Sequence, residues 1–149
     1  HALGWRASMT TLGGLVAVLG VALAITLTDH GPIKGTWYTP EKLEQATSTG
    51  QVVVLEFTAE WCLNCKALDA SVLHSDEVSS LLAEPWVTPI KIDLTGNNTK
   101  GNAMLQAVGR HQIPLLVVIA PNGEEVFKED FYSIGQVVEA INAARTMTK

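Results

Sequence analysis

The sequence predicts an α/β domain, a mixed β-sheet flanked by helices, preceded by one transmembrane helix. Two observations carry this prediction: apolar strand-like runs alternate with capped helical segments after residue 36, and an uncharged apolar stretch precedes them. The chain has 149 residues, 47% of them hydrophobic and 17% charged, which suits one domain with an appendage. The net charge of −5 leaves no excess of cations for phosphates and argues against a nucleic-acid partner.

Residues 7–28 carry no charged side chain, and their centre reads LGGLVAVLGVALAITL. At about 1.5 Å per residue this stretch spans roughly 33 Å, enough for a hydrocarbon core of about 30 Å. We therefore expect a transmembrane helix at 7–28, with residues 1–6 as the flank of a longer chain and residues 29–35 as a linker. The alternatives are a signal peptide cleaved after the A-x-A motif at residues 22–24, and a buried helix of a soluble protein.

Capping residues, helix breakers and apolar runs place the elements of the domain that we expect at residues 36–149. β-branched and apolar runs predict strands at residues 52–57, 90–94, 115–120 and 125–128. Capping residues and amphipathic spacing predict helices at residues 40–50, 62–72, 76–83, 102–108 and 133–146. Because proline cannot donate to a strand ladder, Pro89 should lie at the start of the second strand. The turn Pro121-Asn122-Gly123 makes the last two strands an antiparallel hairpin.

The two cysteines, Cys62 and Cys65, follow directly on the first predicted strand and open the next helix. A first cysteine at a helix N-terminus faces unpaired backbone N–H groups, which stabilise the thiolate and lower the thiol pKa from about 8.5 to roughly 3.5–7.5. The second cysteine lies nearly one turn later, close enough for an intramolecular disulfide. We predict a redox-active dithiol with Cys62 as the exposed nucleophile and Cys65 as the resolving thiol.

A structural disulfide and a metal site are the alternatives for this pair. A disulfide across two intervening residues closes little chain entropy and therefore stabilises little. A zinc site needs two further ligands, but His74 and His111 lie far apart and show no partner pattern. Covalent haem needs a histidine where Lys66 stands. The sequence therefore calls for no metal and no bound organic cofactor.

Two acidic residues flank the cysteine pair. Glu56 stands in an otherwise apolar strand, where desolvation should raise its pKa and let it exchange protons near neutrality; the alternative is that it faces solvent at the strand end. Asp69 follows Cys65 by one helical turn, and its alternative is an ordinary exposed helix acid. We expect Trp61 to shield the disulfide and to offer an apolar docking surface.

The run Glu56-Phe57-Thr58-Ala59-Glu60-Trp61-Cys62-x-x-Cys65-Lys66 resembles the active-site segment of the thioredoxin superfamily. Ile113-Pro114, just before the strand at 115–120, resembles the cis-proline loop of that family. The resemblance implies a thioredoxin-like fold in which Pro114 packs against the disulfide and the backbone at Ile113 pairs with a substrate peptide. It also implies that Glu56 assists deprotonation of Cys65.

The C-terminal domain of the DsbD family, the transmembrane thiol:disulfide interchange reductases, gives a closer resemblance. Residues 92–98, IDLTGNN, resemble the D-[VL]-T-x-N stretch of that family, and Leu63-Asn64 differs from the Gly-Pro pair of thioredoxin. The apolar stretch at 7–28 lies just upstream of the domain, as the last helix of the DsbD membrane domain does. Asp69 matches an acidic position of DsbD-type domains.

This resemblance implies a protein-disulfide reductase of the bacterial inner membrane whose soluble domain faces the periplasm. Cys62 and Cys65 would pass electrons to periplasmic protein disulfides, including those of an N-terminal periplasmic domain, and an adjoining membrane electron-transfer domain would re-reduce them. Two alternatives stay open: a free-standing anchored thioredoxin-like protein for cytochrome maturation, and a redox-inactive binding module.

Overall fold

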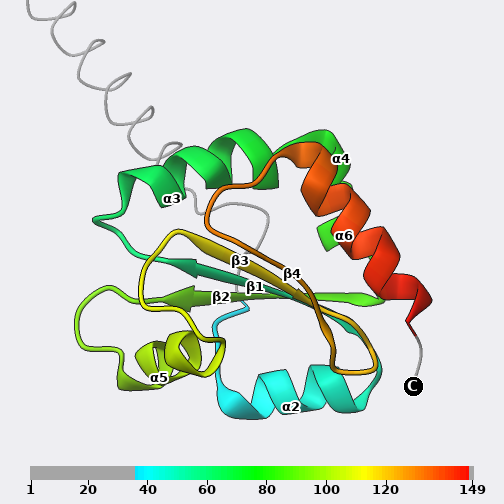
Figure 1. The fold of residues 1–149 in the computed structure, drawn as a ribbon, viewed down its shortest axis with the longest axis horizontal. Helices are drawn as coiled ribbons and strands as arrows, with labels where there is room; N and C mark the ends of the chain where they lie inside the picture. Colours follow the sequence, from blue (N-terminus) through cyan, green and yellow to red (C-terminus); the bar gives the residue numbers. More distant parts are fainter. Residues whose placement is uncertain (1–35, 148–149) are drawn as a thin grey trace, which may run out of the picture. The chain divides into compact units, whose positions relative to one another are not determined.

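The computed structural model describes residues 36–147, which form a β-sheet with helices on both of its faces (Figure 1). The elements, in chain order, are α2 (Pro40–Ser48), β1 (Val52–Thr58), α3 (Leu63–Leu68), η1 (Asp69–Leu73), α4 (Asp76–Leu82), β2 (Val87–Asp93), α5 (Thr99–Ala107), β3 (Leu115–Ile119), β4 (Glu125–Glu129) and α6 (Ile134–Thr146). This arrangement confirms the predicted α/β class.

The transmembrane helix predicted at residues 7–28 lies outside the described residues, as do the predicted flank and linker. Over residues 36–147, no helix combines the length and the apolar character that crossing a bilayer requires.

The sheet is mixed, with its four strands in the order β2-β1-β3-β4. β1 runs parallel to β2 and antiparallel to β3, and β4 is the antiparallel partner of β3. The two central strands, β1 and β3, are buried along almost their whole length, which is why their sequences are nearly continuous apolar runs. β3 and β4 form the predicted hairpin.

Side-chain caps fix where three of the helices begin. Thr39, Ser75 and Ser133 are the N-cap residues of α2, α4 and α6, and each side-chain oxygen accepts a backbone N–H of the first helical turn. Gln136 completes a capping box with Ser133. These caps confirm the helix starts that the sequence predicts.

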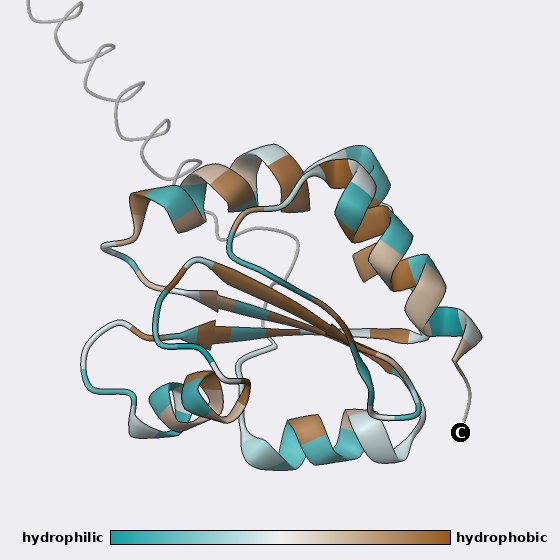
Figure 2. Cartoon of the chain, viewed as in Figure 1, coloured by the Kyte–Doolittle hydropathy of each residue, from teal (hydrophilic) through white to brown (hydrophobic). Residues whose placement is uncertain are grey.

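Two apolar clusters lie on the two faces of the sheet. Val52 and Val54 of β1 belong to the cluster that contains residues of α4 and α6, whereas Val53 and Leu55 belong to the cluster that contains residues of α2 and α5. Figure 2 shows this layering as brown central strands between helices that carry teal residues. Because side chains alternate along a strand, Glu56 faces the α4 and α6 side of the sheet.

The expectation that Pro89 starts a strand is wrong, because Pro89 lies inside β2. β2 is an edge strand of the described sheet. The backbone N–H and C=O of Lys91 point away from β1 and bond Thr36 O and Tyr38 N, both at 2.9 Å. Pro89 lies two residues earlier and faces the same outer side, so its missing N–H removes no bond to β1.

The helix predicted at residues 62–72 is interrupted. α3 ends at Leu68, and the chain continues as the π-helical turn η1. In this turn the Asp69 carbonyl accepts the His74 N–H at 3.0 Å, five residues along the chain. Single π-turns of this kind occur frequently at functional sites.

Candidate functional site

Cys62 and Cys65 form a disulfide at the start of α3, with their Cα atoms 5.3 Å apart. Cys62 is the N-cap residue, as expected, and its Sγ accepts the Cys65 N–H at 3.2 Å. The segment between β1 and α3 forms a turn in which the Cys62 N–H donates to Ala59 O at 3.0 Å. The first sulfur therefore lies where the unpaired amides of a helix start can stabilise negative charge.

The expectation that Cys62 is exposed is wrong for this disulfide form, in which Cys62 is only 6% exposed. Both cysteines belong to the same apolar cluster as Val53 and Leu55, and Ile113 packs against this cluster. Two apolar neighbours of the cysteines lie on the surface: Trp61 is 67% exposed and Leu63 is 79% exposed. Trp61 thus presents an open apolar face beside the disulfide.

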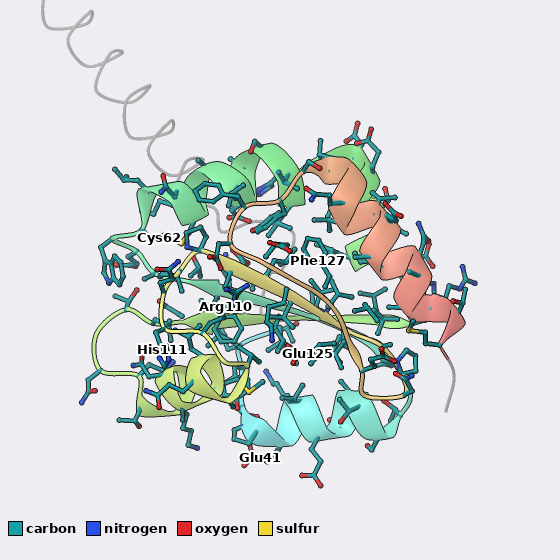
Figure 3. All side chains as sticks on the ribbon, in the orientation of Figure 1. Glu41, Cys62, Arg110, His111, Glu125 and Phe127 are labelled. Atoms are coloured by element: carbon teal, nitrogen blue, oxygen red, sulfur yellow. A yellow bond between two sulfur atoms is a disulfide. The ribbon has the colours of Figure 1, made fainter. Side chains whose placement is uncertain are left out.

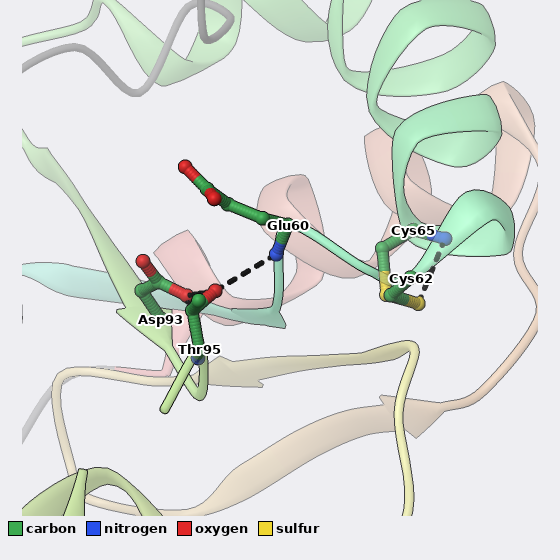
Figure 4. The surroundings of a disulfide bond; sticks show 5 residues. All are labelled: Glu60, Cys62, Cys65, Asp93 and Thr95. Atoms are coloured by element: carbon green, nitrogen blue, oxygen red, sulfur yellow. Dashed lines mark hydrogen bonds between the residues drawn. A yellow bond between two sulfur atoms is a disulfide. The ribbon is translucent and has the colours of Figure 1, made fainter. Parts of the chain in front are cut away.

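A chain of hydrogen bonds ties the cysteine turn to the loop after β2 (Figure 4). The backbone N–H of Glu60 donates to Thr95 Oγ1 at 2.8 Å. Thr95 Oγ1 donates in turn to Asp93 Oδ1 at 2.5 Å, and the same oxygen accepts the Thr95 N–H at 2.8 Å. The segment that resembled the DsbD family thus holds the turn two residues before Cys62.

The cis-proline loop has the predicted geometry, because the Ile113–Pro114 peptide bond is cis. Pro114 is buried and Ile113 is half-buried. Gln112 Nε2 donates to Asp130 Oδ2 at 3.2 Å and so links this loop to the segment after β4. Figure 3 labels Arg110 and His111 on the same loop and Cys62 at the start of α3.

A cluster of charged side chains lies under η1, on the α4 and α6 side of the sheet. Glu56 and Lys91 are in register on the parallel strands β1 and β2, and they are 2% and 4% exposed. Lys91 Nζ lies 3.4 Å from Glu56 Oε2 and 3.7 Å from Asp69 Oδ2. One ammonium therefore bridges two carboxylates, and this burial excludes the alternative that Glu56 faces solvent.

Burial raises the pKa of the Glu56 carboxyl to about 7; the Lys91 ammonium opposes this rise, and the Asp69 carboxylate adds to it. Among the described residues, Glu56 Oε2 has no hydrogen-bond donor in favourable geometry. Burial also raises the pKa of the Tyr132 hydroxyl, and the charges of Glu56 and Asp69 add to that effect. Glu56 can therefore take up and release a proton near neutral pH, as predicted.

The predicted site residues thus fall into two groups. Cys62, Cys65 and Ile113 share an apolar cluster, and Glu56 and Asp69 share the ion cluster. The helix α3, which carries Cys65, lies on the same side of the sheet as α4 and α6, and Glu56 faces that side (Figure 1). Asp69 is mostly buried, with its side chain 15% exposed, so it is not an ordinary exposed helix acid.

The sequence analysis assigns no role to Lys91 or His74, and it includes Thr95 only as part of the segment at residues 92–98. Lys91 stands between Ile90 and Ile92 in an alternating strand, which assigns it to the opposite face from these isoleucines. That alternation could have indicated Lys91. Its pairing with Glu56 also required the strand register, which the sequence does not reveal.

Comparisons with known proteins agree with this geometry. A family model described as thioredoxin-like matches residues 36–121, so the chain belongs to the thioredoxin-like family. The thiol:disulfide interchange protein DsbD of Pseudomonas fluorescens is 30% identical over 83 residues, which cover 56% of this chain and 14% of that protein. DsbD 1 of Pseudomonas aeruginosa is 29% identical over 118 residues, which cover 74% of this chain and 19% of that protein.

A solved structure gives the same relationship in three dimensions. The C-terminal domain of Neisseria meningitidis DsbD in the reduced form matches with a TM-score of 0.58 and 25% identity, covering 74% of this chain and all of that one. Family, fold and cysteine pair define a thioredoxin-like disulfide oxidoreductase domain that resembles DsbD. The chain spans about a seventh to a fifth of the length of the DsbD relatives named above.

Proposed function

We propose that this chain is a membrane-anchored protein-disulfide reductase that passes electrons from the Cys62–Cys65 dithiol to disulfides of periplasmic proteins. The observation that carries the proposal is the disulfide at the start of α3, where Cys62 Sγ accepts the Cys65 N–H at 3.2 Å. A sulfur held in this position is stabilised as a thiolate once the disulfide is reduced, and the thiolate is the attacking form.

The reaction begins when the Cys62 thiolate attacks one sulfur of the partner's disulfide. A bond forms between Cys62 Sγ and that sulfur, and the partner's other sulfur leaves as a thiolate. Cys65 then attacks Cys62 Sγ, which restores the Cys62–Cys65 disulfide and releases the partner's second sulfur as a thiolate. The dithiol loses two electrons and the partner's disulfide gains them.

The second step needs Cys65 to lose its proton, and we assign Glu56 as the base. Glu56 is 2% exposed, and its pKa of about 7 lets the carboxylate accept a proton and later return it near neutrality. Asp69 acts on this step through Glu56, because its negative charge raises the pKa of that carboxyl. Lys91 keeps both carboxyls paired between proton transfers.

We assign partner binding to the surface around the cysteines. Trp61 is exposed beside Cys62, and the resemblance of Ile113-Pro114 to the cis-proline loop of the thioredoxin superfamily supports backbone pairing of an extended partner segment there. The step requires no metal and no organic cofactor, because both electrons come from the dithiol.

The membrane and the electron source complete the proposal. The uncharged stretch at residues 7–28 supports a transmembrane anchor, and the similarity to DsbD supports a periplasmic domain on the bacterial inner membrane. An adjoining membrane domain would reduce the Cys62–Cys65 disulfide, and an N-terminal periplasmic domain or other periplasmic thiol proteins would receive the electrons.

An insulin-reduction assay tests the proposed activity. The chain, with dithiothreitol as electron source, should accelerate the precipitation of reduced insulin, and Cys62→Ser should abolish the acceleration. Pre-reduced Cys65→Ser, mixed with insulin after the dithiothreitol has been removed, keeps the attacking Cys62 and should trap the mixed disulfide, which mass spectrometry detects. Wild-type chain that gives no more precipitation than Cys62→Ser would refute the proposal and favour a redox-inactive binding module.

A further inference from the structure

His74 lies at the end of the π-turn η1, directly beside the ion cluster. Its Nδ1 lies 2.8 Å from the carbonyl oxygen of Asp69 and 3.8 Å from Asp69 Oδ1. The imidazole side chain is 40% exposed, whereas the Asp69 side chain is 15% exposed. The His74 imidazole is therefore open to protons from solvent, and it lies next to the largely buried carboxylate of Asp69.

Asp69 links His74 to Glu56, the buried carboxyl that we assign as the base for Cys65. Asp69 Oδ2 lies 3.7 Å from Lys91 Nζ, and Lys91 Nζ lies 3.4 Å from Glu56 Oε2. Asp69 Oδ1, on the side of His74, is buried and has no hydrogen-bond donor among the described residues. A protonated imidazole is the group placed to offset the charge at that oxygen.

We propose that His74 is a positioning residue that sets the pH dependence of electron transfer by changing the charge next to Asp69. This proposal rests on the proposed function. Histidine is the side chain whose ordinary charge change falls between about pH 5 and pH 8. The imidazolium form offsets the negative charge of Asp69, so Asp69 repels the Glu56 carboxylate less and Glu56 ionises at lower pH. The neutral form leaves that repulsion in place.

The other charged or titratable groups around His74 are the same residues in every variant. Lys91 of β2, Glu56 of β1 and the Tyr132 hydroxyl belong to the same cluster under η1. Asp76 and Glu77, in the first turn of α4, are exposed, and no ion pair joins either of them to His74 in the described part of the chain. The charge on His74 is therefore the variable that distinguishes the variants below.

Two variants of the full chain reproduce the neutral and the protonated state of the His74 imidazole. His74→Gln keeps an N–H that can bond Asp69 O but never carries charge, and His74→Lys carries a positive charge throughout the range. We expect Glu56 to titrate about 0.5 to 1 pH unit higher in His74→Gln than in His74→Lys. The wild type should follow His74→Lys at low pH and His74→Gln at high pH.

The measurement is a ¹³C NMR titration of the Glu56 side-chain carboxyl in the oxidised chain, which needs no turnover. Lys100→Gln, which removes a positive charge from α5 on the other side of the sheet, is the control and should leave the titration of Glu56 unchanged. Insulin-reduction rates against pH should shift in the same order as the NMR midpoints.

Coincident Glu56 titrations in wild type, His74→Gln and His74→Lys would overturn the proposal even if the chain reduces insulin. Ordered titrations in a chain that lacks Cys62-dependent activity would refute the proposed function and remove the part of this proposal that concerns electron transfer. NMR midpoints that shift while the rate profiles coincide would likewise overturn the role of His74 in turnover.

Discussion

Replacing Glu56 with glutamine should change how the stability of the fold depends on pH. Glu56 lies in the centre of β1, is 2% exposed, and has a pKa of about 7 in the fold because burial disfavours its charge. Glutamine has nearly the same shape but does not titrate. Lys91 keeps a carboxylate partner in the variant, because Asp69 Oδ2 lies 3.7 Å from its Nζ.

The size of this pH-dependent change in stability follows from the difference between the pKa of Glu56 in the folded chain and its pKa in the unfolded chain. The carboxyl has a pKa of about 7 in the fold against an ordinary value of 4.5, which corresponds to about 3 kcal/mol. Below pH 4.5 both states hold the proton and the term vanishes. As pH rises from 4.5 to 7, the unfolded chain loses its proton first, so the free energy of unfolding of the wild type falls by about 3 kcal/mol.

Urea unfolding of the oxidised domain at about pH 4.5, 6, 7 and 8, followed by tryptophan fluorescence, measures this term. The free energy of unfolding of Glu56→Gln minus that of the wild type should grow by about 3 kcal/mol across the series. Titrating groups that do not interact with Glu56 are common to both chains and cancel in the difference. A difference that stays constant within about 0.5 kcal/mol would show that Glu56 ionises in the fold as it does in water.

Three further variants test other contacts of the site. Lys91→Met removes the ammonium between two buried carboxylates. The free energy of unfolding in urea should fall by about 3–5 kcal/mol at pH 8 and by less at pH 5. An equal loss at both pH values would contradict the ion cluster. Thr95→Val leaves the Glu60 N–H without its acceptor, which should lower the free energy of unfolding by about 1 kcal/mol and slow alkylation of reduced Cys62. Thr95→Ser keeps the hydroxyl and should behave as wild type. Identical behaviour of the two variants would show that this hydrogen bond does not hold the cysteine turn. Trp61→Ala should change stability by no more than about 0.5 kcal/mol because the ring is exposed, but should lower the insulin-reduction rate several-fold; an unchanged rate would remove Trp61 from partner binding.

Apolar runs and helix caps predicted most of the strands and helices, because these elements depend on burial and on hydrogen bonds between residues close in the sequence. The runs VVVLEF and LLVVI are apolar at successive positions, which suits strands covered on both faces, and they form the central strands β1 and β3. Thr39, Ser75 and Ser133 begin helices because their side chains satisfy amides of the first turn. Glu56 could be predicted as buried because it interrupts an apolar run.

The features that the sequence did not reveal depend on contacts between distant segments. The bridge from Lys91 to Glu56 depends on the parallel register of β1 and β2, and Pro89 is tolerated because β2 lies at the edge of the sheet. The helical pattern at residues 62–72 does not indicate the π-turn that brings His74 to Asp69. The low exposure of Cys62 arises from an apolar cluster whose members lie far apart along the chain.

Alkylation of reduced Cys62 by iodoacetamide, followed as a function of pH, tests the central claim most directly, because it measures whether the start of α3 favours the thiolate. Free cysteine is half ionised at about pH 8.5, and our account predicts that Cys62 reacts as a thiolate at least one pH unit lower, roughly at pH 7.5 or below. A Cys62 that becomes reactive only at the pH of free cysteine, or above it, would contradict the account.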